Sequence, residues 1–290
     1  MLLKKSGWFW AVGACLFSSS IWVFTRALIP FMPVTAQLFW RLFAASFLIL
    51  LIFRKKIRLE NILNISFKDF VLIFLRAFGL YALGTTLAAT AIQEAKYGTV
   101  VLFLSLPVGS VLATVLLKEY LGPRAWLAIG LSTLGIVLAV LDRYAVSIVG
   151  GRGELLALIA SVVMALALIT RRWQSNALNE FELTFGVLSL ASLQFLTATM
   201  IFGIPLGFEF SFDVIGLLVL SGIWTAAFLY CVTAALMRMK IYEANLVFGF
   251  QPLLGALIGF VLYNEEVSVF SALAALMLLM SIIVLNRRSN

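Results

Sequence analysis

The sequence predicts an all-α integral membrane protein, and three observations lead to this fold class. Hydrophobic residues make up 63% of the 290 residues and charged residues only 12%, whereas an ordinary soluble domain has roughly 45–50% and about 25%. The apolar residues gather in long runs, and the connections between the runs are short. A soluble chain of this length has no place for so much apolar surface, but a lipid bilayer accommodates it.

Each apolar run is long enough for a membrane span, because crossing about 30 Å of hydrocarbon takes roughly 20 helical residues. Ten transmembrane helices are predicted, at residues 8–28, 33–53, 70–92, 97–117, 123–141, 153–173, 182–203, 214–237, 242–262 and 267–285. Several connections contain turn-forming residues, such as Pro30, Pro33 and the pair Gly122-Pro123. No connection is long enough for a soluble domain, so the chain is expected to form one membrane domain.

Lys and Arg are unevenly divided between the two sides of the predicted spans. Fifteen of the 21 fall on the side of both termini, four fall on the opposite side, and Arg41 and Arg76 lie within spans. The positive-inside rule therefore predicts that both termini are cytoplasmic. This distribution also explains the net charge of +8, so no nucleic-acid partner is expected. Lys4 and Lys5 precede an apolar run without an obvious cleavage site, which predicts a retained first helix.

Several kinds of chemistry are excluded by residue content. The chain has no histidine, so Ser-His-Asp catalysis and imidazole metal ligands are impossible. Cys15 and Cys231 lie inside apolar runs and are interpreted as small core residues rather than as a disulfide. The sequence shows no paired carboxylates in mid-span, no phosphate-binding glycine loop and no cysteine-rich metal site. A membrane-embedded enzyme is therefore disfavoured, and neither a cofactor nor a metal is expected.

A short motif recurs at a constant offset of 145 residues. Tyr97, Phe103 and Pro107 correspond to Tyr242, Phe248 and Pro252. The two matched helices are five spans apart, an odd number, so the copies must run in opposite directions through the membrane. The chain is therefore predicted to divide into two inverted five-helix repeats, residues 1–145 and 146–290, a plan typical of secondary transporters. A chance match between Leu-rich segments is the alternative.

Further segments have the pattern of a known family: Pro107 with Glu119, Pro252 with Glu265, Gly153-Glu-Leu-Leu-Ala-Leu-Ile-Ala160, and Arg41 within Gln37-Leu-Phe-Trp-Arg-Leu-Phe-Ala-Ala45. With the length and the repeat, they resemble the ten-helix EamA branch of the drug/metabolite transporter superfamily along nearly the whole chain. The resemblance implies two inverted five-helix bundles around a central cavity, alternating access, and amino acids or other small metabolites as substrates. It also implies a bacterial inner membrane as the location, with export as the expected direction.

Two other functions stay open beside this one. Some relatives take up S-adenosylmethionine or a nucleoside-like metabolite, and a lipid-linked substrate flippase is a further alternative. The internal repeat lets one chain build the whole pathway. A monomer is therefore sufficient, and a homodimer stays possible.

The two prolines of the repeat are candidate hinges. Pro107 and Pro252 lie in mid-span, where a proline frees the carbonyl four residues earlier, at Phe103 and Phe248. In lipid such a carbonyl needs a partner, so the break must face protein or a water-filled cavity. We expect helices four and nine to bend there and to supply carbonyls to the substrate or hinges to the motion. A static kink that packing satisfies is the alternative.

Candidate substrate-binding residues combine aromatic rings with hydroxyl or amide groups, a combination that suits an amphipathic solute. They are Ser18, Trp22, Tyr81, Thr85, Phe103, Trp224, Tyr230, Asn245, Phe248 and Gln251. Helical spacing places Asn245, Phe248, Pro252, Gly255 and Gly259 on one face of helix nine, where the small residues favour close helix approach. For each ring, core packing or the interfacial aromatic belt is the alternative.

Arg41 is a charge within the second span, where burial costs about 2.5 kcal/mol or more. It is expected either to attract a substrate carboxylate or to act as a structural pin bonded to carbonyls or a boundary carboxylate. The family resemblance favours the pin. No Asp or Glu lies at the centre of a span, which favours facilitated diffusion or exchange, with Glu94 or Glu265 as fallback proton sites.

Overall fold

The computed structural model describes residues 2–94, 105–118, 121–141, 152–207, 211–263 and 269–286, and within them the chain is all-helical. The first half contains α1 (Leu2–Leu28), α2 (Val34–Ile52), α3 (Leu59–Leu63), α4 (Phe67–Ala77), the π-helix η1 (Phe78–Ala82), α5 (Gly84–Glu94), α7 (Ser105–Leu117) and α8 (Pro123–Leu141). The second half contains α9 (Arg152–Trp173), α10 (Glu180–Phe202), α11 (Phe212–Arg238), α12 (Ile241–Phe248), α13 (Gln251–Tyr263) and α14 (Val269–Asn286).

Among the described residues, seven helical segments are long and apolar enough to cross a membrane: Gly7–Leu28, Val34–Ile52, Phe67–Ala88, Leu155–Trp173, Glu180–Phe202, Phe212–Arg238 and Ile241–Leu262. They correspond to seven of the ten predicted spans. The other three predictions, 97–117, 123–141 and 267–285, coincide with the shorter apolar helices Leu106–Leu117, Pro123–Leu138 and Ala272–Leu285. The membrane-protein class is therefore confirmed, and the total of ten spans stays a prediction.

Polar caps fix where several spans begin and end. Ser66 accepts a hydrogen bond from the Asp69 amide and starts α4, and Ser211 accepts one from the Val214 amide and starts α11. Asn179 and Glu182 form a capping box on α10, which ends at Gly203 in the left-handed conformation with φ +64°. These groups accept hydrogen bonds from backbone amides that helix ends leave unpaired. Such pairing is most important beside lipid, because no water is present there to bond the amides.

Helices of the two halves begin at matching places. Val34 and Glu180 start α2 and α10, Phe67 and Phe212 start α4 and α11, Ser105 and Gln251 start α7 and α13, and Pro123 and Val269 start α8 and α14. Each pair is 145 or 146 residues apart, which agrees with the offset of the sequence motif. The repeat is therefore a property of the helices and extends well beyond the short motif.

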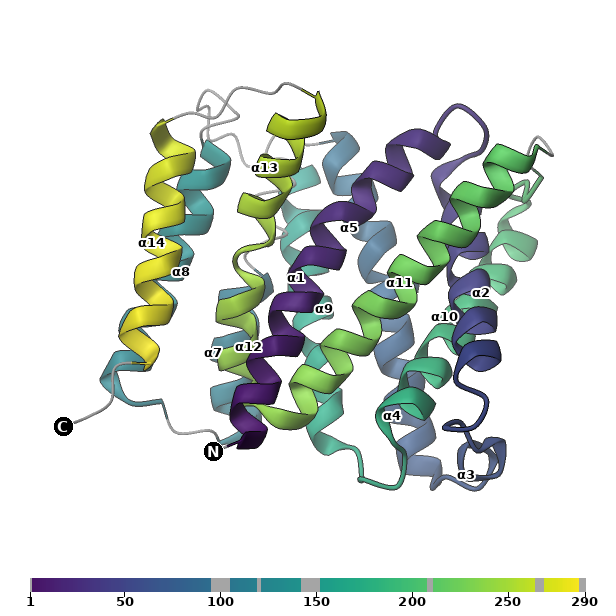
Figure 1. Ribbon diagram of the computed structural model, residues 1–290, viewed down its shortest axis with the longest axis horizontal. Coiled ribbons are helices and arrows are strands. Elements are labelled where there is room, and N and C mark those ends of the chain that lie inside the picture. Colours follow the sequence, from purple (N-terminus) through teal and green to yellow (C-terminus); the bar gives the residue numbers. More distant parts are fainter. Residues whose placement is uncertain are drawn as a thin grey trace.

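The packing partners of the helices also correspond between the halves. α1 packs on α11 in the first case, and its counterpart α9 packs on α5 and α4 in the second. Likewise, α2 packs on α11, and its counterpart α10 packs on α4. α7 contacts α9, and correspondingly α12 and α13 contact α1. Three further contacts join the two halves: α2 with α10, α7 with α12, and α8 with α14. Figure 1 shows α8 and α14 side by side at one edge of the bundle, with α1 and α11 crossing its middle.

The surface and the core have the character of a protein in lipid. Large apolar side chains such as Phe9, Val115 and Ile283 are 61–70% exposed. The buried core around α1, α7, α11 and α12 is rich in alanine, including Ala11, Ala14, Ala113, Ala235 and Ala244. Small residues of this kind let helix backbones approach closely where hydrophobic exclusion between helices is weak. α1 begins and α14 ends at the same end of the bundle (Figure 1).

Candidate functional site

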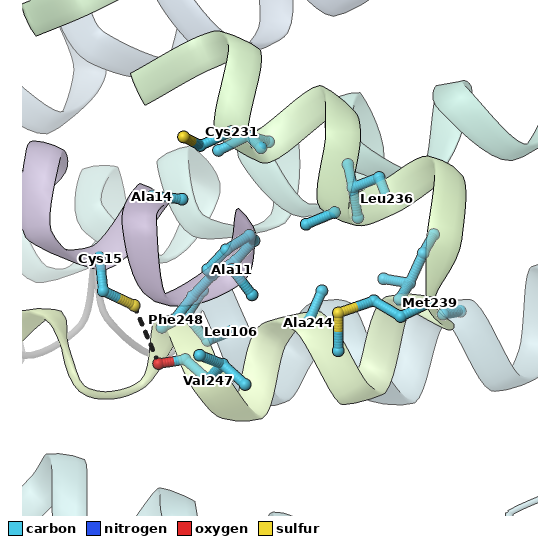
Figure 2. Close-up of a cluster of buried hydrophobic side chains, with 14 of the residues drawn as sticks. Ala11, Ala14, Cys15, Leu106, Cys231, Leu236, Met239, Ala244, Val247 and Phe248 are labelled. Atoms are coloured by element: carbon cyan, nitrogen blue, oxygen red, sulfur yellow. Dashed lines mark hydrogen bonds between the residues drawn. The ribbon is translucent and has the colours of Figure 1, made fainter. Parts of the chain in front are cut away.

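A break in the ninth predicted span lies at the centre of the candidate site. α12 ends at Phe248 and α13 begins at Gln251, and every residue of α12 is buried. The thiol of Cys15 on α1 lies 3.0 Å from the Val247 carbonyl oxygen. The hydroxyl of Ser19 lies 3.0 Å from the Gln251 carbonyl oxygen. Figure 2 shows the Cys15 contact among the packed side chains of α1, α11 and α12. Two groups one turn apart on α1 therefore bond carbonyls on either side of the break.

The ninth predicted span is interrupted beside Pro252, where a bend was predicted, but the details differ from the expectation. The helix is interrupted at residues 249 and 250, just before the proline, and the carbonyls bonded to α1 belong to Val247 and Gln251 rather than to Phe248. The Phe248 side chain is buried in the core that includes α1 and α7. Because α12 and α13 are separate helices, a single helical face does not continue from Asn245 to Gly259, contrary to the sequence prediction.

In the first half, α7 begins two residues before Pro107, as α13 begins one residue before Pro252. Residues 95–104, which include Phe103, lie outside the described residues. The same holds for several side chains that carried predictions, namely Trp22, Pro252, Glu94, Glu119 and Glu265. The roles predicted for them stay predictions. A Cβ atom on Gly255 would meet nothing within 4 Å, so the close approach expected there is wrong.

Asn245 joins α12 to α7. Its side chain is buried, and its Nδ2 lies 3.5 Å from the Ser110 hydroxyl, while its Oδ1 has no hydrogen-bond partner. A Cβ atom on Gly109 would lie 2.9 Å from the same Nδ2, so the glycine makes room for the amide. An unpartnered amide oxygen in an apolar interior is costly, and a polar solute is one way to satisfy it.

A second polar group joins α1, α2 and η1. The Arg41 guanidinium donates a hydrogen bond from Nη1 to the Thr25 hydroxyl at 3.1 Å. Tyr81 on η1 interacts electrostatically with Arg41. The Arg41 Nε and the Tyr81 hydroxyl are both buried without a hydrogen-bond partner. Thr85, predicted beside Tyr81 as a substrate-binding residue, donates to the Leu80 carbonyl of its own π-turn at 2.9 Å, and its role in binding stays a prediction.

Three other predicted residues have partners inside the bundle. The Trp224 indole Nε1 on α11 donates to the Ser20 hydroxyl on α1 at 2.7 Å, and its ring makes edge contacts with Phe17 and Phe24. Ser18 donates to the Cys15 carbonyl of its own helix at 3.1 Å. Gln251 is half-buried and contributes its backbone carbonyl to the contact with Ser19.

Tyr230 belongs to a separate group at the ends of α10 and α11. Its hydroxyl donates to the Glu180 carboxylate at 3.1 Å, and the same carboxylate forms an ion pair with Arg238. The Tyr230 ring packs on Trp10 and Phe181. Its prediction as a substrate-binding residue therefore competes with a structural role in holding these helix ends together.

Sequence reasoning assigned no role to several buried charged residues, among them Arg76 and Glu182. Arg76 on α4 donates to Thr170 at 3.3 Å and to Gln174 at 2.5 Å, both near the end of α9. The carboxylate of Glu182 accepts hydrogen bonds from the amides of Arg58 and Asn179 and from the Asn61 side chain. The position of Arg76 within a span was a visible signal, but no periodicity identifies partners about 100 residues away.

The described part of the chain has no group of three or more His, Cys, Asp or Glu residues that could hold a metal ion. The site consists instead of helix-break carbonyls, an amide, an arginine, hydroxyls and aromatic rings. This set offers hydrogen bonds and apolar contact to a solute.

Comparison with known proteins is consistent with a site that binds a solute. A solved structure described as "Crystal structure of protein" superposes with a TM-score of 0.79 at 16% sequence identity, over 97% of this chain and 96% of that chain. At this identity the likeness shows the fold alone. No curated protein matches the chain. The model of the EamA-like transporter family matches twice, over residues 5–141 and 151–287, so this chain belongs to that family of membrane transporters and contains two copies of its repeat.

Proposed function

We propose that this protein is a secondary transporter that moves small amphipathic metabolites, foremost amino acids or their derivatives, outward across the inner membrane by alternating access. The observation that carries the proposal is the break between α12 and α13. Irregular backbone at membrane depth is tolerated where it is buried in protein or lines a cavity, and broken helices are typical of transporter binding sites.

The correspondence between the halves supports alternating access. The largest packing contacts of the described helices correspond when each helix is exchanged with its counterpart, as expected for two similar bundles related by a two-fold axis. With five spans in each half, the copies are inverted, and the same contacts serve a state open to either side. One chain contains both bundles, so a monomer is sufficient for transport.

The orientation follows from charge and from the position of the helix ends. α1 begins and α14 ends at one end of the bundle (Figure 1), which is the end where most Lys and Arg residues were predicted to lie. The positive-inside rule places this end in the cytoplasm.

The substrate class follows from the polar groups that the fold holds in the membrane interior. Asn245 offers an unpartnered amide oxygen to an amine or hydroxyl. The spans carry no carboxylate at their centres, which favours exchange or facilitated diffusion over proton coupling.

Counterflow in proteoliposomes tests this proposal. Vesicles with the full chain are loaded with one unlabelled solute at a time, among aromatic, aliphatic and basic amino acids and S-adenosylmethionine, and uptake of the labelled solute is followed. We expect exchange of an amino-acid class and a loss of about tenfold in the Asn245→Ala variant, because about 1.4 kcal/mol of lost binding corresponds to that factor.

Thr197→Ala is the matched control, because Thr197 is an exposed residue whose hydroxyl bonds only the Leu193 carbonyl of its own helix. Its counterflow should equal that of the wild type. Absence of exchange for every solute, with wild-type protein that is monodisperse and unfolds cooperatively, contradicts the proposal. Exchange of S-adenosylmethionine alone replaces the amino-acid class with the nucleoside-like one.

A further inference from the structure

Arg41, Thr25 and Tyr81 form a polar group between three elements of the first half. Arg41 lies on α2, Thr25 near the end of α1, and Tyr81 on η1. Arg41 and Tyr81 are 40 residues apart in sequence, and they interact electrostatically. The only hydrogen bond of Arg41 among the described residues goes from Nη1 to Thr25.

Two donors in this group have no acceptor. The Arg41 Nε and the Tyr81 hydroxyl are buried, and neither has a hydrogen-bond partner. Tyr81 as a whole is only 9% exposed. A guanidinium has only donors, and a neutral tyrosine hydroxyl donates its proton most strongly to an anion. Leaving such groups unpaired in an apolar interior is expensive.

The backbone that positions Tyr81 is itself unusual. η1 is a π-helical turn in the middle of the third span, and π-turns are rare and frequent at functional sites. Thr85 bonds the Leu80 carbonyl that this turn exposes. A Cβ atom on Gly84 would lie 2.1 Å from the Gly79 carbonyl oxygen, so the turn requires a glycine there. The sequence therefore maintains a rare turn at Tyr81, the residue that interacts electrostatically with Arg41.

A purely structural arginine is expected to have its donors satisfied by the protein or its charge balanced by a carboxylate; Arg171, whose Nε also lacks a partner, interacts electrostatically with Asp69 and Glu180. Glu182 shows how this chain treats such a group, because its buried carboxylate accepts three hydrogen bonds. Arg41 has one neutral acceptor and no carboxylate among the described residues. Arg41 as a whole is half-buried rather than fully enclosed.

The geometry points to a carboxylate subsite, in which the substrate's carboxylate accepts hydrogen bonds from Arg41 Nε and from the Tyr81 hydroxyl. This inference rests on the proposed function and narrows its substrates to metabolites with a free carboxylate. Thr25 acts as a positioning residue, because its hydroxyl holds Nη1 and so orients the guanidinium. Two donors match the two oxygens of one carboxylate, and the apolar surroundings strengthen the bonds.

Acid and amide forms of the same solute test the inference. Counterflow is compared for phenylalanine and phenylalaninamide, leucine and leucinamide, and lysine and lysinamide, at about pH 6, where the α-amine stays protonated in each pair. We expect the wild type to prefer the acid at least about tenfold, since a hydrogen bond to a charged group contributes about 1.5–3 kcal/mol. Arg41→Gln should abolish this preference and Tyr81→Phe should weaken it, mainly through KM.

Arg54→Gln is the control, because Arg54 is an exposed arginine in the turn after α2, and it should keep the full preference. Arg41→Lys keeps the charge without the planar fork and should fall between wild type and Arg41→Gln. Equal transport of acid and amide by the wild type, or an unchanged preference in folded Arg41→Gln, overturns the subsite while the transporter proposal stands.

A direct binding measurement separates the two proposals if no solute is exchanged. The thermal unfolding of the purified full chain is followed with benzoate or benzamide at equal ionic strength. Stabilisation of the wild type by benzoate, absent with benzamide and absent in Arg41→Gln, supports the subsite even where the transport proposal fails. Equal shifts for the two compounds overturn it.

Discussion

Ser19 on α1 places its hydroxyl 3.0 Å from the carbonyl oxygen of Gln251, the first residue of α13. The two residues are 232 positions apart, as are Cys15 and Val247. The same hydroxyl lies 2.7 Å from the Cys15 carbonyl, so its proton is shared between α1 and the break. The first helix therefore stabilises an interruption in the ninth predicted span, whose carbonyls would otherwise lack partners in an apolar interior.

Replacing Ser19 with alanine should weaken the break. We expect Ser19→Ala to lower the stability in detergent by about 1 kcal/mol, because the Gln251 carbonyl loses its hydrogen-bond donor. The measurement is thermal unfolding of the purified protein. Ser18→Ala is the control, because Ser18 bonds only a carbonyl of its own helix and its loss should change the stability little. Equal destabilisation by the two variants would contradict the role given to Ser19.

Replacement of two glycines by alanine should change the stability of the protein differently. Gly84→Ala places a Cβ atom 2.1 Å from the Gly79 carbonyl oxygen and 2.8 Å from Met164, and overpacking of this kind costs about 1–3 kcal/mol. A Cβ atom on Gly130 in α8 meets nothing within 4 Å, so Gly130→Ala should be neutral or stabilising by up to about 1 kcal/mol. Unfolding temperatures of the two variants against wild type check the contrast. A Gly84→Ala protein as stable as wild type would show that the π-turn does not need glycine.

Removing the Glu182 carboxylate should be among the most damaging changes at the helix ends. Three donors, from Arg58, Asn61 and Asn179, lose their acceptor, so we expect Glu182→Ala to cost about 2–4 kcal/mol. Glu182→Gln should cost less, because one amide oxygen remains. Glu60→Ala is the control, since Glu60 is exposed on α3. Denaturant titrations followed by intrinsic fluorescence give the ranking, and a Glu182→Ala cost no larger than that of Glu60→Ala would contradict it.

The Trp224 indole and the Ser20 hydroxyl should be energetically coupled. Trp224→Phe keeps the ring contacts with Phe17 and Phe24 but removes the donor to Ser20. A double-mutant cycle with Ser20→Ala should give a coupling energy of about 0.5–1.5 kcal/mol. The cycle is measured by thermal unfolding of the two single variants, the double variant and the wild type. Additive effects would mean that this hydrogen bond contributes nothing to the packing of α1 on α11.

The sequence predicted the membrane class and the position of the ninth-span break to within a few residues. It placed a bend at Pro252, because proline removes a backbone donor wherever it lies. It was wrong about one continuous face from Asn245 to Gly259, since periodicity assumes an unbroken helix. The close approach expected at Gly255 was also wrong. Instead, Gly109 makes room for Asn245, and a neighbouring helix has to be placed before such a contact is visible.

The sequence by itself determined where the apolar spans lie and that the chain contains two similar halves. Both follow from local properties, namely side-chain transfer into lipid and a repeated pattern along the chain. Only the tertiary structure decided which polar groups meet: Ser19 with Gln251, Arg41 with Thr25 and Tyr81, and Glu182 with three donors. Such pairings depend on how each helix is rotated and packed against helices far away in sequence, and hydropathy does not fix that rotation.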